Sequence, residues 1–151
     1  MPSSLSGSTS ARVRDRPRDH VNPERPRDRY GRPLRRGADP GTAYPGVPDR
    51  TFVSGSRAWL EALDYVEQDL PFHAHEVFEQ RWRCAPQTER ALWQALAQWG
   101  AALTHEARGN ATGARRIAER ALSGLDSATI VEPTDAGVVT ASLRRLLANL
   151  A

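Results

Sequence analysis

The stretch FHAHEVFEQRWR, residues 72–83, combines two histidines and two glutamates with large apolar side chains. In a helix, which advances about 100° per residue, one face of this stretch holds the ionisable residues His75 and Glu79 among Phe72, Phe78 and Trp82. A polar group that leaves water costs free energy unless it is paired. We therefore expect His75 and Glu79 to be mostly buried against the next helix, with partners, a ligand or a water-filled cleft.

Metal binding is the first chemistry open to this face. The residues HEVFE resemble the start of the zinc-protease motif HExxH, in which two ligands lie one helical turn apart and the intervening glutamate is the base. Here Glu79 takes the second ligand position, and His105 is a candidate third ligand, so His75, Glu79 and His105 are weak candidates for a divalent metal. Glu76 argues against a protease, because it lies about 100° from His75 around the helix. The Glu-x-x-His pattern of di-iron bundles is absent, since Phe72 stands three residues before His75.

Two interpretations need no metal. Glu79 could orient His75 for acid–base catalysis and fix its tautomer, but no serine or cysteine nucleophile stands at an adjacent position. The other interpretation is a buried polar network in which His75, Glu79 and Gln94 satisfy one another and set the register of the helices. The lone Cys84 has no internal disulfide partner, and we assign it no role.

The helices that position these residues follow from the spacing of apolar side chains. Ser54 or Ser56 can cap a first helix, with an apolar face of Trp59, Leu60, Leu63, Val66 and Leu70. A second helix, about 71–85, begins at Pro71 and ends before Pro86, because the residue before a proline is biased away from helical angles. Thr88 can cap a third helix that runs to Arg108.

The later segments have the same helical spacing. The third helix has one buried line, made of Leu92, Leu96, Trp99, Gly100 and Leu103. Gly109 and Asn110 stop it and start a fourth helix, whose inner stripe is Ala114, Ile117, Ala118, Ala121, Leu122 and Leu125, while Arg115, Arg116, Glu119 and Arg120 form the outer one. A loop that includes Gly124 then leads to a fifth helix from about Asp135, with Val139, Leu143, Leu146, Leu147 and Leu150 inward.

This spacing predicts an all-α fold, a compact bundle of about five helices in helical hairpins over residues 51–151, because no segment alternates with the period of two that marks a strand. A similarity between two segments of the chain is consistent with paired helices. The segments DLPFHAHEVFE (69–79) and GNATGARRIAE (109–119) align at an offset of 40 residues, a period found in helix-pair repeats.

The first fifty residues differ from the rest. They hold 11 of the 21 arginines and 6 acidic residues, a net charge of +5, whereas residues 51–151 hold 10 arginines and 12 acidic residues, a net charge of −2. Such an Arg/Pro-rich stretch buries little apolar surface, so we expect a disordered N-terminal tail at 1–50. Within it, 25–48 is a candidate docking strap, because Tyr30 and Leu34 stand among turn-forming Gly and Pro. Its arginines suggest nucleic acid only weakly, since acidic residues interleave with them.

No run approaches the roughly 18 consecutive apolar residues of a membrane-spanning helix. Residues 1–20 lack the apolar centre of a secretory signal. We therefore expect a cytoplasmic location and no membrane partner.

The runs FHAHEVFEQRWR, ERALWQALAQWGAALTHEARGN and GNATGA together resemble the domain-of-unknown-function family 309, a group of small helical proteins. The resemblance covers roughly residues 57–147 and is strongest at 71–125. It implies a compact bundle in which the His-Glu helix faces the Gln- and His-bearing helix, and it implies no reaction. The family pattern carries over at Phe72, His75, Glu76, Glu79, Trp82, Gln94, His105, Gly109, Asn110, Gly113 and Ala114.

These observations favour a binding or interaction module, and leave open whether the protein is an enzyme. The alternative is a metal-dependent or acid–base hydrolase that uses a cleft at His75, Glu79 and His105. The candidate site comprises His75, Glu76, Glu79, Trp82, Arg83, Gln94 and His105, at the mouth between the second and third helices. Gly109, Asn110 and Gly113 have a structural role in the turn. A protein partner, a small ligand or a second copy of the chain would each fit such a surface.

Overall fold

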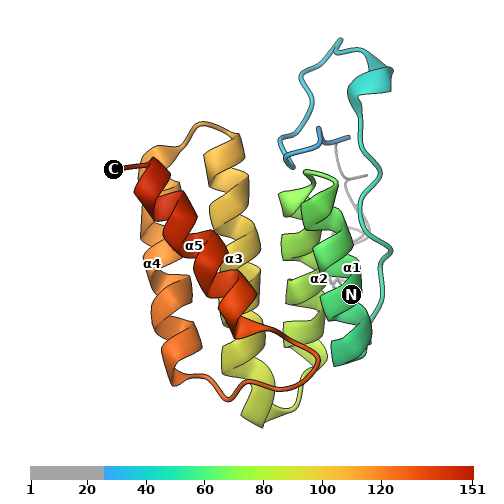
Figure 1. Ribbon diagram of the computed structural model, residues 1–151. Coiled ribbons are helices and arrows are strands. Elements are labelled where there is room, and N and C mark those ends of the chain that lie inside the picture. Colours follow the sequence, from blue (N-terminus) through green and yellow to red (C-terminus); the bar gives the residue numbers. More distant parts are fainter. Residues whose placement is uncertain (1–25) are drawn as a thin grey trace, which may run out of the picture.

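The computed structural model describes residues 26–151, which form five α-helices and no β-strand (Figure 1). The helices are α1 (Gly55–Glu67), α2 (Pro71–Cys84), α3 (Arg90–Ala107), α4 (Ala111–Ser127) and α5 (Ala136–Asn149), with short 3-10 turns at Pro40–Thr42 and Gln87–Glu89. Neighbouring helices pack in pairs, α1 on α2, α2 on α3, α3 on α4 and α4 on α5. The predicted all-α bundle of helical hairpins is confirmed.

The central helix is α3, which contacts α2, α4 and α5. Its predicted line is buried at Leu92, Leu96 and Trp99, but Trp93, which lies off that line, is also fully buried. Trp93 packs against Phe78 of α2, with 6.3 Å between ring centroids. The helix α3 is therefore buried on more sides than the single line that the spacing predicted.

Three sequence-based details are wrong. Leu60 is 64% exposed, because α1 packs mainly on α2 and buries the adjacent face that carries Ala58, Trp59 and Ala62. Thr88 does not cap α3, which starts at Arg90 after the 3-10 turn. Gly124 lies inside α4 rather than in a loop, because α4 continues to Ser127.

In Figure 1 residues 26–50 (blue to teal) lie above the upper ends of α1 and α2 and then descend beside this pair of helices, where Pro45 and Pro48 bond to side chains of α2. The carbonyl oxygens of Pro45 and Pro48 accept hydrogen bonds, each 2.7 Å long, from His73 Nε2 and Gln80 Nε2. Near the start of the segment, Arg29 donates to backbone carbonyls at the end of α1, and Arg32 donates to Arg108 O at the end of α3. Whether 1–50 is a tail separate from a domain at 51–151 stays a prediction, and residues 1–25 lie outside the described part.

The offset of 40 residues has a counterpart in the backbone. Asp69 and Gly109 both have positive φ, +58° and +77°, where the chain turns from α1 to α2 and from α3 to α4. Leu70 N donates to Tyr65 O (2.8 Å), and Asn110 N donates to His105 O (2.9 Å), so donors and acceptors are each 40 residues apart. The two hairpins thus share one turn geometry. No helix within residues 26–151 is long and apolar enough to cross a membrane.

Candidate functional site

His75 and Glu79 lie one turn apart on α2, with His75 Nε2 3.4 Å from Glu79 Oε1. The second Glu79 oxygen lies 3.4 Å from Arg83 Nη2. The side chains of His75 and Glu79 are 24% and 41% exposed, so both are more than half buried, but neither lies fully inside the core. The reason is that α2 buries the face of His73, Ala74, Val77, Phe78 and Arg81, and the His75–Glu79 edge lies beside it.

The His75 ring is held by α3. Its Nδ1 lies 2.8 Å from Ala97 O, and because a carbonyl oxygen only accepts, Nδ1 carries the proton and donates. Nε2 is therefore the nitrogen that faces Glu79. The helices approach closely here, since a Cβ added to Gly100 would lie 2.8 Å from His75 N and Cα. A residue with a side chain would force α2 and α3 apart at this point.

The fully buried polar side chains of α2 were missed by the sequence analysis. His73, Gln80 and Arg81 are each at most 9% exposed, and they hydrogen-bond to carbonyl oxygens of residues 45, 48 and 53. The segment before α1 therefore supplies hydrogen-bond acceptors to this face, which has a structural role, although His73 Nδ1 and Arg81 Nε have no hydrogen-bond partner among the described residues. Phe72 is half-buried by the same segment, because Gly31 lies against its ring and the Arg27 guanidinium lies 5.8 Å from the ring centroid.

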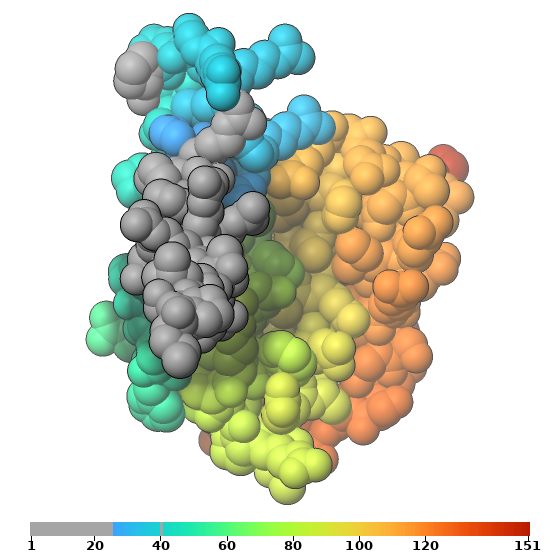
Figure 2. Space-filling view, turned by 180° about the vertical axis from the view of Figure 1, so that it is seen from behind, coloured from blue at the N-terminus to red at the C-terminus, as the bar shows by residue number. Residues whose placement is uncertain are grey.

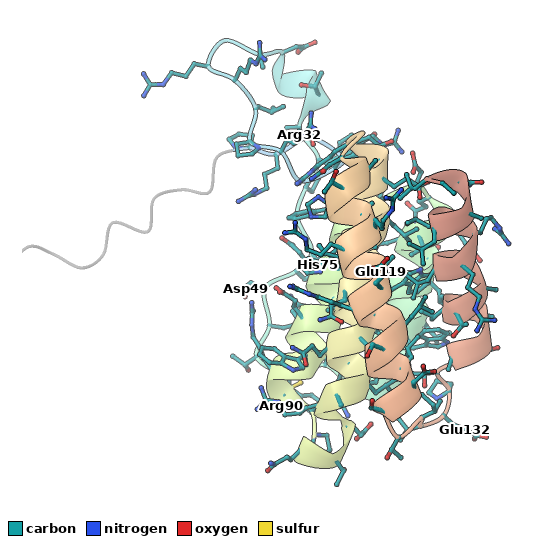
Figure 3. All side chains as sticks on the ribbon, turned by 90° about the vertical axis from the view of Figure 1, so that its left-hand side faces the viewer. Arg32, Asp49, His75, Arg90, Glu119 and Glu132 are labelled. Atoms are coloured by element: carbon teal, nitrogen blue, oxygen red, sulfur yellow. The ribbon has the colours of Figure 1, made fainter. Side chains whose placement is uncertain are left out.

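An open groove of about 240 Å³ lies between α2 and α4, with α3 as its floor. Its apolar lining is Trp82, Ala97, Ala101 and Ile117. Its polar lining is His75, Glu79, Gln94, Gln98 and Arg120. In Figure 2 the surface is hollowed where α3 lies between α2 (green) and α4 (orange), and Figure 3 places His75 on the side of α4 that faces α2.

Four candidate residues, His75, Glu79, Trp82 and Gln94, meet in this groove. Two more, Glu76 and Arg83, line a neighbouring cavity of about 300 Å³ with Val47, Asp49 and Gln80, and Glu79 lines both. Gln94 is exposed, so a buried network of His75, Glu79 and Gln94 does not form. Trp82 is half-buried, with the Arg90 guanidinium 4.6 Å from its ring centroid.

His105 lines neither cavity. Its Nδ1 lies 3.0 Å from Asn110 Nδ2 and accepts that amide proton, while Asn110 Oδ1 accepts from Gly113 N at 3.0 Å and so caps α4. Burial, followed by the charges of Arg108 and His75, lowers the pKa of His105. His105 thus joins Gly109, Asn110 and Gly113 in the α3–α4 turn.

The geometry bears directly on the metal interpretation. Within residues 26–151, no group of three or more His, Cys, Asp or Glu side chains is arranged to hold a metal ion. His75 and Glu79 supply two donors, and His105 is engaged in its own turn. The third ligand that the sequence suggested is therefore not brought to the pair.

Gln98 and Arg120 belong to the groove but were not among the candidate site residues. Arg120 was assigned to the outer stripe of the fourth helix. It stands three residues after Ile117, and residues three apart on a helix share a side, so this spacing was the available signal. That α4 turns this side toward α2 follows only from how both helices pack on α3.

Residues 59–117 match the family model described as "Domain of unknown function (DUF309)". This range contains α2, α3 and most of the groove lining, but not Arg120 or the segment at 26–50. No curated protein and no solved structure matches the chain.

Proposed function

Because the chain carries a DUF309 domain at residues 59–117, a family whose description names no activity, we propose that it is a binding module and that the groove between α2, α3 and α4 is its binding site. The observation that carries this proposal is the composition of the groove. Small and aromatic side chains form its floor and one wall, and polar groups from three helices converge on it. Concave apolar sites with a few convergent polar groups are the usual form of a ligand site.

The size of the groove favours a small ligand or one side chain of a partner. Its volume, about 240 Å³, is just below the range of roughly 300–1,000 Å³ that holds drug-sized ligands. Ala97 and Ala101 have small side chains, which leave space above the floor of the groove. The hydrogen bond to Ala97 O holds the His75 ring of the α2 wall in place. A site on such rigid helices needs little ordering when a ligand binds.

The test is to fill the groove. In Ala101→Phe the new ring would occupy the floor, whereas Ala141→Phe places the same ring on an exposed position of α5 and serves as the control. Trp82 is the reporter, because the indoles of Trp59, Trp93 and Trp99 are buried. A fragment library is expected to shift the Trp82 indole resonance in the native protein and in Ala141→Phe, but not in Ala101→Phe. Shifts confined to α4 and α5, or none beside a concentration-dependent dimer, would contradict the proposal.

Acid–base catalysis is a second candidate, and the orientation of His75 is the observation that favours it. The Ala97 carbonyl fixes the ring so that Nε2 faces Glu79 at the groove edge. Among the described residues that line the groove there is no serine, threonine or cysteine, so a hydrolase here would need water as the nucleophile. Ester hydrolysis that is lost in His75→Gln, with fragment binding retained, would support this candidate over simple binding.

A further inference from the structure

Among the described residues that line the groove, Glu79 is the only carboxylate, and it is already paired within the protein. Glu79 Oε1 lies 3.4 Å from His75 Nε2, and Glu79 Oε2 lies 3.4 Å from Arg83 Nη2. A cationic ligand would have to compete with the Arg83 guanidinium for this carboxylate. The α2 wall therefore offers little to a positively charged group.

The opposite wall has unused donors. Arg120 of α4 is exposed, and among the described residues its guanidinium takes part in no hydrogen bond or ion pair. The side-chain amides of Gln94 and Gln98, on the floor beside it, are likewise without a hydrogen bond in residues 26–151. An arginine presents five N–H donors in a fork that matches a carboxylate.

The surroundings add positive charge at the rim. Arg83 lies on the α2 side, and Arg90 at the start of α3 lies over the Trp82 ring, 4.6 Å from its centroid. A cation that approached Trp82 would meet the like charge of Arg90. Among the described residues that line the groove, Glu79 is the one carboxylate that an anion near Arg120 would meet, and the Arg83 guanidinium already pairs with it.

On the basis of the binding function above, we propose that the groove takes a small amphipathic anion. Its carboxylate pairs with Arg120 and the Gln94 and Gln98 amides, and a flat apolar group lies against Trp82 and Ile117. The two halves of such a ligand match the two kinds of lining in the groove. Both hydrogen bonding and charge then favour an acid over its neutral or cationic analogue.

The test uses three probes with the same ring and different charge, namely phenylacetate, phenylacetamide and phenethylamine. Each is titrated into the full chain while the Trp82 indole resonance is followed. Phenylacetate is expected to bind about tenfold more tightly than phenylacetamide, because a hydrogen bond to a charged group is the stronger kind. Phenethylamine is expected to bind most weakly, and added salt to weaken phenylacetate alone, since exposed charges are screened.

Arg120→Gln and Arg116→Gln form the matched pair of variants. Both remove an exposed arginine from α4, but Arg116 lies outside the groove. Arg120→Gln is expected to weaken phenylacetate about tenfold and to leave phenylacetamide unchanged, while Arg116→Gln changes neither. Equal affinity of acid, amide and amine, no effect of Arg120→Gln, or no binding by any probe would overturn this ligand class. If fragments still occupy the groove in that case, the binding function stands and only the ligand class falls.

Discussion

At Gly100 a single missing methyl group sets the distance between α2 and α3. A Cβ there would lie 2.8 Å from two backbone atoms of His75, and backbone atoms cannot rotate away as a flexible side chain does. We predict that Gly100→Ala lowers the free energy of unfolding by about 1–3 kcal/mol, the usual cost of overpacking, even though alanine is the better helix former. Urea unfolding measures the loss.

Gly124→Ala is the control for this prediction. Gly124 also lies within a helix and faces α3, but the nearest atom to an added Cβ is the Ala95 methyl at 3.2 Å. That contact is tight but milder, and the gain in helix propensity offsets part of it. If both variants lose the same free energy of unfolding, the close contact between Gly100 and the His75 backbone does not limit stability more than an ordinary helix contact.

His105 gives a prediction about pH. Its pKa is lowered in the folded protein, first by burial and then by Arg108 and His75, so the unfolded chain binds the proton more readily. Its contribution to stability is therefore complete above the unfolded pKa, near 6.5, and is lost as the pH falls through the lower folded pKa. We expect the urea midpoint to fall on acidification from neutral pH, in part because protonated Nδ1 no longer accepts from Asn110.

The variant His105→Asn tests this origin. Without the imidazole, the midpoint should depend less on pH between about 7 and 5, an interval that includes the ordinary histidine pKa. If the urea midpoint changes equally with pH in both proteins, groups other than His105 cause the loss of stability in acid. Urea midpoints for both, measured across this interval, decide between these outcomes.

At the scale of elements, the segment at 26–50 supplies hydrogen-bond acceptors to His73 and Gln80, two of the polar residues that α2 buries. Gly31 of this segment has φ +75°, and a Cβ there would lie 2.4 Å from the Phe72 ring. We predict that Gly31→Ala lowers the melting temperature by destabilising the docked segment, through both the strained φ and the clash with Phe72. Differential scanning calorimetry measures the change.

Gly37→Ala is a matched control in the same segment. Gly37 also has a positive φ, +82°, but an added Cβ would meet no atom within 4 Å. It therefore carries only the conformational cost, about 1–2 kcal/mol for an L residue in this region. If the melting temperature falls no further in Gly31→Ala than in Gly37→Ala, the segment does not pack on Phe72 in solution.

For the whole molecule, truncation tests the predicted division of the chain. Removing residues 1–20 is expected to leave the melting temperature unchanged, because their composition buries little apolar surface. Removing 1–50 takes away the carbonyl oxygens bound by His73 and Gln80, and each buried group left unpaired costs about 1–3 kcal/mol. Equal melting temperatures for the full chain and both truncations would rule out a docking strap.

Helical spacing predicted most of the helix positions, because apolar residues three and four apart must share a face wherever a helix packs on a core. Gly109 and Asn110 also marked the α3–α4 turn correctly. Spacing did less well at Leu60, which belongs to an edge helix that packs mainly on α2. A periodic stripe gives the width of an apolar face but not how many neighbours cover it.

The candidate site was predicted in part. His75, Glu79, Trp82 and Gln94 were expected together and do line one groove, since α2 packs against α3 as the paired helices suggested. His105 was expected there too, but the turn at Asn110 engages it instead. Residue types and spacing along one helix are local properties, whereas the direction of a side chain near a helix end depends on the turn that follows.

By itself the sequence determined the all-α class, the hairpin order and the helix that carries His75 and Glu79, because these depend on periodicity and on Gly and Pro at helix ends. Only the tertiary structure decided which polar residues are buried. His73, Gln80 and Arg81 pair with a segment some thirty residues earlier in the chain, and Arg120 reaches the groove from α4. Pairings over such separations are set by how whole helices pack, and no local spacing encodes them.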